Sequence, residues 1–264
     1  MIPLITVVTV TYNDLEGFRR TADSIMPQLS PAVEWLIKDG GSDSHTLQQI
    51  KSLVTGTDCT LLSSCDNGVY NAMNQSLSIA KGAWIMFMNG GDKFASDDVL
   101  SRIVRVVSGV SSADVSGFIL GGGTKLIAEN GQSWLSPARS MAQCQGVNCY
   151  RMPAFHQSQL YSRSIYFEQG FREELAVSAD HAYFWEAIDK GALFVPLDFF
   201  VSCFYLGGLS TKKRLRSCMD VGYSIFNIQR QVGLIGLLAF VKRLLASYLP
   251  VFRHWCFGSR RVSI

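Results

Sequence analysis

Features typical of several other protein classes are missing from this 264-residue sequence. Its seven cysteines include no two-residue-spaced pair of metal ligands and no even-numbered framework like that of small secreted domains, so we expect reduced thiols. The longest apolar stretch in the second half, residues 232–241, is about half as long as a membrane-spanning helix. No charged-then-apolar export signal opens the chain, and we therefore expect a cytoplasmic protein.

Acidic residues are scarce near the end of the chain. The formal net charge is +3, from 24 Lys and Arg against 21 Asp and Glu. Residues 211–264 hold ten of these basic residues and a single acid, Asp220, which leaves residues 1–210 mildly acidic. With 48% hydrophobic and 17% charged residues, the composition is that of a folded globular protein. We expect one globular domain over residues 1–210 and a basic helical tail over residues 211–264.

The first 90 residues alternate between apolar strands and amphipathic helices. Apolar, β-branched runs predict strands at residues 5–10, 33–38, 60–63 and 83–88. Helical spacing predicts helices over residues 15–25 and 70–80, the first of them with a capping box formed by Asn13 and Glu16. This alternation predicts an α/β fold in which helices cover a mostly parallel sheet.

The pattern after residue 90 is less regular. We expect a helix over residues 97–107, two strands at 115–120 and 124–128 around three glycines, a helix over 178–188 and a short strand at 193–196. Residues 132–153 have no clear period, so we interpret them as a loop.

Polar residues follow each of the four early strands. They occupy residues 11–13, 39–43, 66–67 and 89–92. Ligands of such sheets bind outside the carboxyl ends of the strands, where these segments should converge. The sequence therefore predicts one ligand-binding crevice lined by all four.

Each carboxylate of this crevice has two interpretations when it is considered alone. Asp92 lies in a tight turn and suits a hard divalent cation that bridges two phosphates, because phosphates and water supply the other oxygens, or it belongs to an ordinary turn. Asp39 suits a ribose or base contact, or a turn or helix cap. Asp66, with Asn67 and Gly68, is equally compatible with a simple turn.

Taken together, the segments resemble the family-2 inverting glycosyltransferases of GT-A fold, most closely the branch found in colanic-acid and related exopolysaccharide or O-antigen clusters. The matching segments are residues 6–13, 34–42, 66–74, 87–92, 156–157, 178–180 and 207–210. The resemblance implies a catalytic domain that transfers a sugar from a UDP- or GDP-sugar to a saccharide hydroxyl. It also implies inversion at the anomeric carbon, with no covalent enzyme intermediate.

The resemblance implies roles for individual residues as well. Nucleotide contacts are expected from Val10, Thr11, Tyr12, Asp39, Gly40, Asp66, Asn67 and Gly68. Contacts to the donor or acceptor sugar are expected from Asn71, Asn74, Asn89, Gly90, Gly91, His156 and Gln157. Asp92 would bind Mg²⁺ or Mn²⁺, which neutralises charge on the departing nucleoside diphosphate, and Asp180 would be the general base.

Two positions depart from the family pattern. The acidic motif of the family usually carries more than one carboxylate, whereas Asn89 and Gly91 leave Asp92 alone here, which predicts weak metal affinity without nucleotide. Asn71 stands where close relatives usually have Asp.

Two alternative functions remain open on the sequence alone. The acidic motif, which here has Asp92 as its single carboxylate, is also compatible with an inactive nucleotide-sugar-binding protein of the same fold. A nucleotidyltransferase or a dinucleotide-binding enzyme is the second alternative. No Gly-x-Gly-x-x-Gly turn follows the first predicted strand, which argues against dinucleotide binding.

The tail combines an apolar helical stripe with basic and aromatic residues. The stripe consists of Leu234, Leu237, Leu238, Val241, Leu244, Leu245 and Tyr248. Lys242 and Arg243 lie beside it, and Trp255, Phe257, Arg260 and Arg261 follow. This composition suits an anionic lipid surface rather than nucleic acid, and the alternative is a helix that packs on the domain. The acceptor in the resembled family is typically a lipid-linked oligosaccharide, so we expect peripheral attachment to the cytoplasmic face of the inner membrane.

Overall fold

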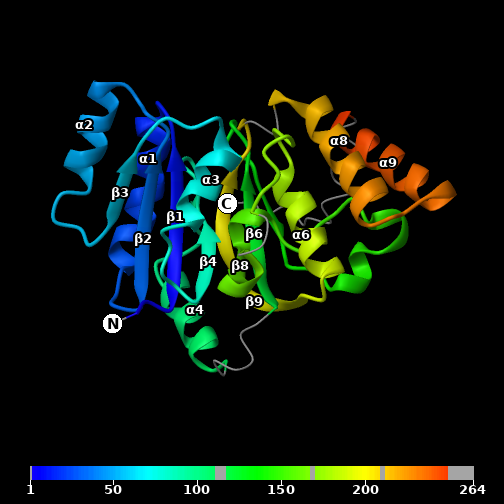
Figure 1. The fold of residues 1–264 in the computed structure, drawn as a ribbon, viewed down its shortest axis with the longest axis horizontal. Coiled ribbons are helices and arrows are strands. Elements are labelled where there is room, and N and C mark those ends of the chain that lie inside the picture. Colours follow the sequence, from blue (N-terminus) through cyan, green and yellow to red (C-terminus); the bar gives the residue numbers. More distant parts are fainter. Residues whose placement is uncertain (1, 111–116, 167–169, 209–211, 249–264) are drawn as a thin grey trace.

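The computed structural model describes residues 2–110, 117–166, 170–208 and 212–248 (Figure 1). Its strands form one nine-stranded sheet in the order β3-β2-β1-β4-β8-β6-β9-β5, and β7 pairs with β6. The strands are β1 (Ile5–Thr11), β2 (Val33–Asp39), β3 (Thr60–Ser63), β4 (Trp84–Phe87), β5 (Lys93–Phe94), β6 (Phe118–Ile127), β7 (Ser133–Ser136), β8 (Gln159–Ser162) and β9 (Leu193–Tyr205).

Helices flank this sheet, and those of the tail lie at the end of the molecule opposite α2 (Figure 1). The helices are α1 (Leu15–Ile25), α2 (Ser44–Leu53), α3 (Val69–Leu77), α4 (Val99–Ser108), α5 (Arg163–Tyr166), α6 (Ala179–Asp189), α8 (Arg214–Tyr223) and α9 (Gly233–Tyr248). Short helical turns are η1 (Met26–Gln28), η2 (Met141–Cys144), η3 (Gly146–Asn148), η4 (His156–Ser158) and the π-helix η5 (Ser224–Ile228).

The α/β class is confirmed, and the parallel pairing is concentrated where the crevice was predicted. Strands β3, β2, β1 and β4 pair in parallel, with Thr11 opposite Asp39 at their carboxyl ends. Beyond β4 the sheet is mixed, because β8 is antiparallel to both β4 and β6, while β6 and β9 are parallel. These later pairings join segments far apart in sequence, so local periodicity carries no signal for them.

Two hydrophobic cores cover the two faces of the sheet. Alternate residues of β1 divide between them, since Ile5 and Val7 belong to one core and Val8 and Val10 to the other. The first core is completed by α1, α2 and α4, and the second by α3 and α6. Because both faces are covered, ligands can reach the strands only at their ends.

Several predicted boundaries were wrong. The strands expected at 115–120 and 124–128 are one strand, β6, although residues 115 and 116 lie outside the described ranges. A Cβ on Gly121 would lie 2.5 Å from the Phe194 ring, and a Cβ on Gly123 would lie 2.6 Å from the Phe200 ring. The glycines therefore leave room for the aromatic side chains of β9, and β6 continues through them as one strand. Accordingly β9 continues well past residue 196 to Tyr205.

Two other predictions were wrong, one on the N-cap of α1 and one on residues 132–153. The N-cap of α1 is Asp14, whose Oδ1 accepts a hydrogen bond from Gly17 N at 2.8 Å, and not Asn13. Asn13 instead adopts a left-handed backbone (φ 46°), which ends β1 with a sharp turn. Residues 132–153, expected to be a loop, include β7 and two short helical turns.

The described part of the tail packs against the domain through small residues. On α9 the buried residues are Gly236, Ala239, Ala246 and Ser247. The apolar side chains are largely turned outward: Leu234, Leu237, Leu238, Val241 and Tyr248 of the predicted stripe are exposed, and Leu244 and Leu245 are half-buried. Trp255, Phe257, Arg260 and Arg261 lie outside the described residues. Every helix of the described ranges is too short or too polar to cross a bilayer.

Candidate active site

Backbone hydrogen bonds draw three of the predicted site segments together at the carboxyl end of β1. Gly40 N donates to the carbonyl of Thr11 at 2.9 Å, and Gly90 N donates to the carbonyl of Val10 at 3.0 Å. A Cβ on Gly90 would lie 3.3 Å from the same Val10 oxygen, so glycine lets the 89–92 turn lie against the strand end. The segments that were predicted to converge therefore do meet at this edge.

Asp39 organises the loop that follows β2. Its Oδ2 accepts hydrogen bonds from Gly41 N at 3.2 Å, Ser42 N at 3.0 Å and the Ser63 hydroxyl at 2.6 Å, and its Oδ1 accepts one from the Ser42 hydroxyl. The residue is fully buried. Oδ2 is thus saturated, and Oδ1 keeps one further acceptor position.

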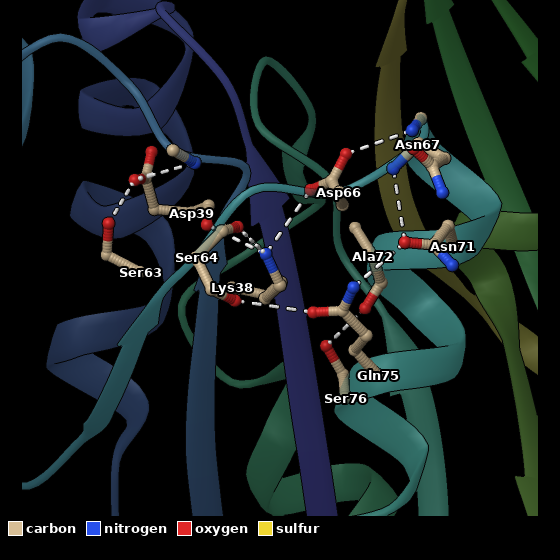
Figure 2. A network of polar contacts seen from close by, with 12 residues as sticks. Lys38, Asp39, Ser63, Ser64, Asp66, Asn67, Asn71, Ala72, Gln75 and Ser76 are labelled. Carbon is tan, nitrogen blue, oxygen red and sulfur yellow. Dashed lines mark hydrogen bonds and ion pairs between the residues drawn. The ribbon is translucent and has the colours of Figure 1, made fainter.

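A buried ion pair joins Asp66 to β2. Lys38 Nζ lies 3.3 Å from Asp66 Oδ2 and donates to the carbonyls of Asp39 (2.8 Å) and Ser64 (2.6 Å), as Figure 2 shows. Lys38 was not among the residues predicted from the sequence, although a lone lysine at the end of an apolar strand is a signal that burial will pair it. A Cβ on Gly40 would lie 2.7 Å from Asp66 Oδ2, so the two predicted nucleotide contacts are direct neighbours.

The asparagines of α3 contact protein rather than the crevice. Asn71 Nδ2 and Asn74 Nδ2 donate to the two carboxylate oxygens of Glu173, at 2.9 and 2.8 Å. The Asn71 amide oxygen accepts from Asn67 N at 3.1 Å, and Asn74 also bonds both backbone groups of Phe171. The departure at Asn71 has a physical reason here, because an aspartate would face the Glu173 carboxylate.

Asp92, the last residue of the 89–92 turn, is almost fully buried against η4 and β9. Its Oδ2 accepts from Gln157 Nε2 at 2.9 Å, and its Oδ1 accepts from Tyr205 N at 3.2 Å. Burial raises the pKa of Asp92 to about 7, although these two hydrogen bonds and the charge of Arg20 act in the opposite direction. Arg20 also stacks over the Tyr205 ring and donates to the Gly91 carbonyl, which fixes the turn.

His156 and Gln157, adjacent in η4, connect the two sides of the site. Gln157 holds Asp92, while the His156 ring lies 5.5 Å from the Phe87 ring and 5.7 Å from the Phe171 ring. Both His156 nitrogens are buried with no hydrogen-bond partner among the described residues. Burial lowers the pKa of His156, against the nearby charge of Asp180, so the imidazole is neutral at pH 7.

Asp180 lies in the first turn of α6, on the other side of the same aromatic cluster. Its Oδ1 is 2.9 Å from the Tyr70 hydroxyl, which is also 2.9 Å from the Val177 carbonyl. The Tyr70 ring packs 5.6 Å from the Phe171 ring. Asp92 and Asp180 are therefore linked through Gln157, His156, Phe171 and Tyr70.

Two polar groups of the crevice are left without partners. Thr11 Oγ1 and Asn89 Oδ1 are buried and bond to no other described residue, while Tyr12, directly after β1, is 63% exposed. Buried polar atoms are seldom left unsatisfied, so these two oxygens are candidates for ligand contacts.

The donor set fits a cation that takes most of its ligands from phosphate. No three His, Cys, Asp or Glu side chains within the described ranges are grouped so that they could hold a metal ion alone. The Asp92 carboxylate and the unpartnered Asn89 oxygen, which share one turn, are the hard oxygen atoms that a cation could use there. Mg²⁺ and Mn²⁺ accept such sparse protein ligation when a diphosphate completes the shell.

Comparison with known proteins identifies the family. The family profile described as glycosyl transferase family 2 matches residues 6–153, which is more than half of the chain. The chain belongs to this family. A relative in Mycobacterium tuberculosis, an uncharacterized glycosyltransferase, is 32% identical over 108 residues, 40% of this chain and 41% of its own. A PGL/p-HBAD biosynthesis glycosyltransferase of Mycobacterium bovis is 28% identical over 115 residues, 43% of this chain and 45% of its own.

This family-2 chain spans less than half the length of the curated relatives it matches. Solved structures support the GT-A fold over nearly all of it. TarS of S. aureus, crystallised with UDP, has a TM-score of 0.60 at 16% identity and is covered to 72%, with 96% of this chain aligned. The mannosyltransferase PcManGT of Pyrobaculum calidifontis, in complex with GDP-Man and Mn²⁺, has a TM-score of 0.62 at 15% identity, covering 98% of this chain and 73% of its own.

Proposed function

We propose that this family-2 glycosyltransferase transfers a sugar, with inversion, from a UDP- or GDP-sugar to a hydroxyl of a saccharide during synthesis of a bacterial surface polysaccharide. The colanic-acid, exopolysaccharide and O-antigen pathways are the context that the sequence resemblance suggests. One observation carries the proposal: Asp92 and Asp180, from distant parts of the chain, lie on two sides of one aromatic cluster. Two such separated carboxylates can serve leaving-group stabilisation, through a bound metal ion, and proton removal.

The nucleotide would occupy the crevice at the ends of β1 and β2. Thr11 Oγ1 is available there for a hydrogen bond, and Tyr12 can cover the base. The ion pair of Lys38 with Asp66 and the saturated Asp39 keep this wall rigid. We assign Asp39 a role in shaping the nucleotide site, with one acceptor position left for ribose.

Asp180 would accept the proton of the acceptor hydroxyl while that oxygen forms a bond to the anomeric carbon. In the same step the bond from that carbon to the donor phosphate breaks, and the nucleoside diphosphate leaves with the electron pair. Asp92 and Asn89 would hold a Mg²⁺ or Mn²⁺ ion, which supplies positive charge against the leaving diphosphate when it is bound. The neutral, apolar-packed His156 would position the sugar.

The proposal is tested by a thermal-shift screen of UDP, GDP, UDP-GlcNAc and GDP-mannose, each with Mn²⁺ and with EDTA. A ligand that binds only the native state raises the apparent melting temperature, so one nucleotide series should stabilise the protein, and more strongly with Mn²⁺. Release of UDP or GDP from the stabilising donor should then increase when a saccharide acceptor is added. Stabilisation without any nucleotide release would instead favour an inactive nucleotide-sugar-binding protein.

We further propose that residues 1–210 are the catalytic domain and that the basic tail attaches it to the cytoplasmic face of the inner membrane, near a lipid-linked acceptor. The exposed apolar face of α9 supports this proposal. Lys212, Lys213, Arg214 and Arg216 line an open depression with Tyr248, next to this face. Arg216 also pairs with Asp220, Lys242 donates to Asn148 and Arg243 donates to Ser217, so these three cations contribute to packing. Cations beside an apolar face match an anionic lipid surface.

Exchange of Leu234, Leu237 and Leu238 for Ser should strongly weaken this attachment. We expect the native chain to co-sediment with vesicles containing phosphatidylglycerol at low salt, and less at high salt, since each basic residue near the surface contributes about 1 kcal/mol. The triple variant should bind at least tenfold more weakly. A matched control replaces three exposed apolar residues elsewhere, Ile79, Leu193 and Val195, by Ser and should bind normally. Equal binding of the two triple variants would exclude α9 as the attachment surface.

A further inference from the structure

The single acid of the tail bonds directly to the segment that leads into α6. Asp220 of α8 is 2% exposed, and its Oδ2 accepts hydrogen bonds from Val177 N at 2.9 Å and Ser178 N at 3.1 Å. Ser178 is the residue that precedes the first turn of α6, and Asp180 lies in that turn. The two amide groups that Asp220 binds are thus two and three residues away from the proposed base.

Three more tail side chains hold the same segment. Arg216 pairs with Asp220 Oδ1 at 3.0 Å and donates to the Glu174 carbonyl at 2.8 Å. The hydroxyls of Ser217 and Ser178 are 2.8 Å apart, and Arg243 of α9 donates to the Ser217 hydroxyl at 2.9 Å. The Asp220 charge is therefore compensated, and residues 174–178 are bonded to the tail at four backbone or side-chain positions.

The domain holds the opposite side of this segment. The Tyr70 hydroxyl contacts the Val177 carbonyl and Asp180 itself, while Asn71 and Asn74 bind Glu173. The peptide groups around Val177 are consequently fixed on their N–H side by α8 and on their carbonyl side by α3. Because the segment is held on both sides, these contacts determine where α6 begins and in which direction it runs.

We propose that Asp220 is a positioning residue for Asp180, so that the tail completes the active site in addition to any role in attachment. The inference rests on the proposed function, in which Asp180 takes the proton of the acceptor. A general base must lie within hydrogen-bond reach of that proton, and displacement by about 1 Å costs on the order of 100-fold in rate. Loss of the Asp220 carboxylate leaves two buried amide groups without their acceptor, so the segment before Asp180 must move to satisfy them.

The test compares Asp220→Ala with Ile225→Ala in the full-length protein. Ile225 is fully buried in the same tail core, but its side chain has no polar atom that could hold residues 174–178, so its truncation destabilises the tail without removing the restraint. The readout is the slow release of UDP or GDP from UDP-GlcNAc or GDP-mannose with water as the acceptor, well below the melting temperature. The dissociation constant for the corresponding nucleotide is measured in parallel.

We expect Asp220→Ala to lower kcat by about 10- to 100-fold while nucleotide affinity stays within twofold of wild type. Ile225→Ala should lower the melting temperature at least as much and keep kcat within twofold. Equal kcat values for the two variants would overturn the positioning role. Should Asp220→Ala fail to fold, Arg216→Gln, at a half-exposed side chain, replaces it, with an expected three- to tenfold loss of kcat. An unchanged kcat in that variant would overturn the role equally.

A combined variant separates this inference from the proposed function. Because Asp220 acts through Asp180, adding Asp220→Ala to Asp180→Asn should reduce the residual rate by less than twofold, and a fully additive loss would contradict the positioning role. If Asp180→Asn alone keeps wild-type turnover, the base assignment in the proposed function fails. If Asp180→Asn is inactive and Asp220→Ala behaves like Ile225→Ala, only the positioning role fails.

Discussion

Replacement of Asp180 by Asn is expected to lower the rate of sugar transfer by about 10²- to 10⁴-fold, the usual contribution of a positioned general base. Asn keeps the shape of the side chain and can still accept the hydrogen bond from the Tyr70 hydroxyl, so α6 should begin as before. It cannot accept the acceptor proton. The dissociation constant for UDP or GDP should remain within twofold of wild type, because the loss is confined to the chemical step.

The measurement is steady-state transfer together with equilibrium nucleotide binding. Asp189→Asn is a matched control, since it makes the same chemical change at the exposed other end of α6. This control should retain wild-type kcat and affinity. Near-normal turnover of Asp180→Asn would show that another group removes the proton, and weakened nucleotide binding would place Asp180 in the donor site.

Replacement of Asp92 by Asn should abolish the effect of Mn²⁺ on nucleotide binding and yet stabilise the metal-free protein. Without the carboxylate, affinity for UDP or GDP in Mn²⁺ should fall to the value measured in EDTA, with turnover reduced by at least about 100-fold. The gain in stability follows from removal of the buried charge. The new side-chain amide can be accommodated, because rotation of the Gln157 amide turns its oxygen toward the position that Asp92 Oδ2 occupies in the native chain.

The pH dependence of that stability has a definite sign. Burial raises the pKa of Asp92 from 3.8 to about 7, so the native state binds the proton more tightly than the unfolded state. The free energy of unfolding contributed by this group is therefore largest below about pH 4 and decreases as the pH rises to about 7. At pH 8 in EDTA, Asp92→Asn should unfold with a free energy larger by on the order of 2 kcal/mol, and the difference should shrink at pH 5.

Urea unfolding at pH 5 and pH 8 measures this difference. The exposed Asp198→Asn serves as the control and should change the free energy of unfolding at neither pH. A variant at Asp92 that is destabilised at pH 8 would mean that the carboxylate is ionised and well solvated in the metal-free protein. Mn²⁺-dependent nucleotide affinity in that variant would remove Asp92 from the metal site.

Most early elements of the fold could be predicted because their signals are local. The periodicities of β1 to β4, α1 and α3 lie within each element, and the parallel pairing of those strands follows from their alternation with helices. By contrast, β8 carries no distinctive run and is defined by its antiparallel neighbours β4 and β6. Likewise, the need for glycines within β6 comes from Phe194 and Phe200, which pack against them from β9, far along the chain.

The same division applies to the candidate site. The meeting of polar segments at the ends of β1, β2 and β4 was predictable, since the residues that follow parallel strands must share one edge. Four residues of the site region could not be predicted: Lys38, Tyr70, Glu173 and Asp220. Each forms a hydrogen bond or ion pair with a residue remote in sequence, and none belongs to a motif of its own. The spacing of residues along the sequence gives no information on such pairs.

From the sequence alone, the family, the α/β class and the sheet edge at which the polar segments meet were accessible, because all three depend on residue order and short-range periodicity. Only the tertiary structure decided which polar groups are already satisfied. Asp39 Oδ2 is saturated by its own loop and by Ser63 of β3, whereas Thr11 and Asn89 keep oxygens with no partner among the described residues. It also decided that α9 packs through Gly236 and Ala239 and leaves its leucines outside. The physical reason is that burial and hydrogen-bond pairing depend on which distant segments come into contact, and a periodic pattern specifies a face without specifying what covers it.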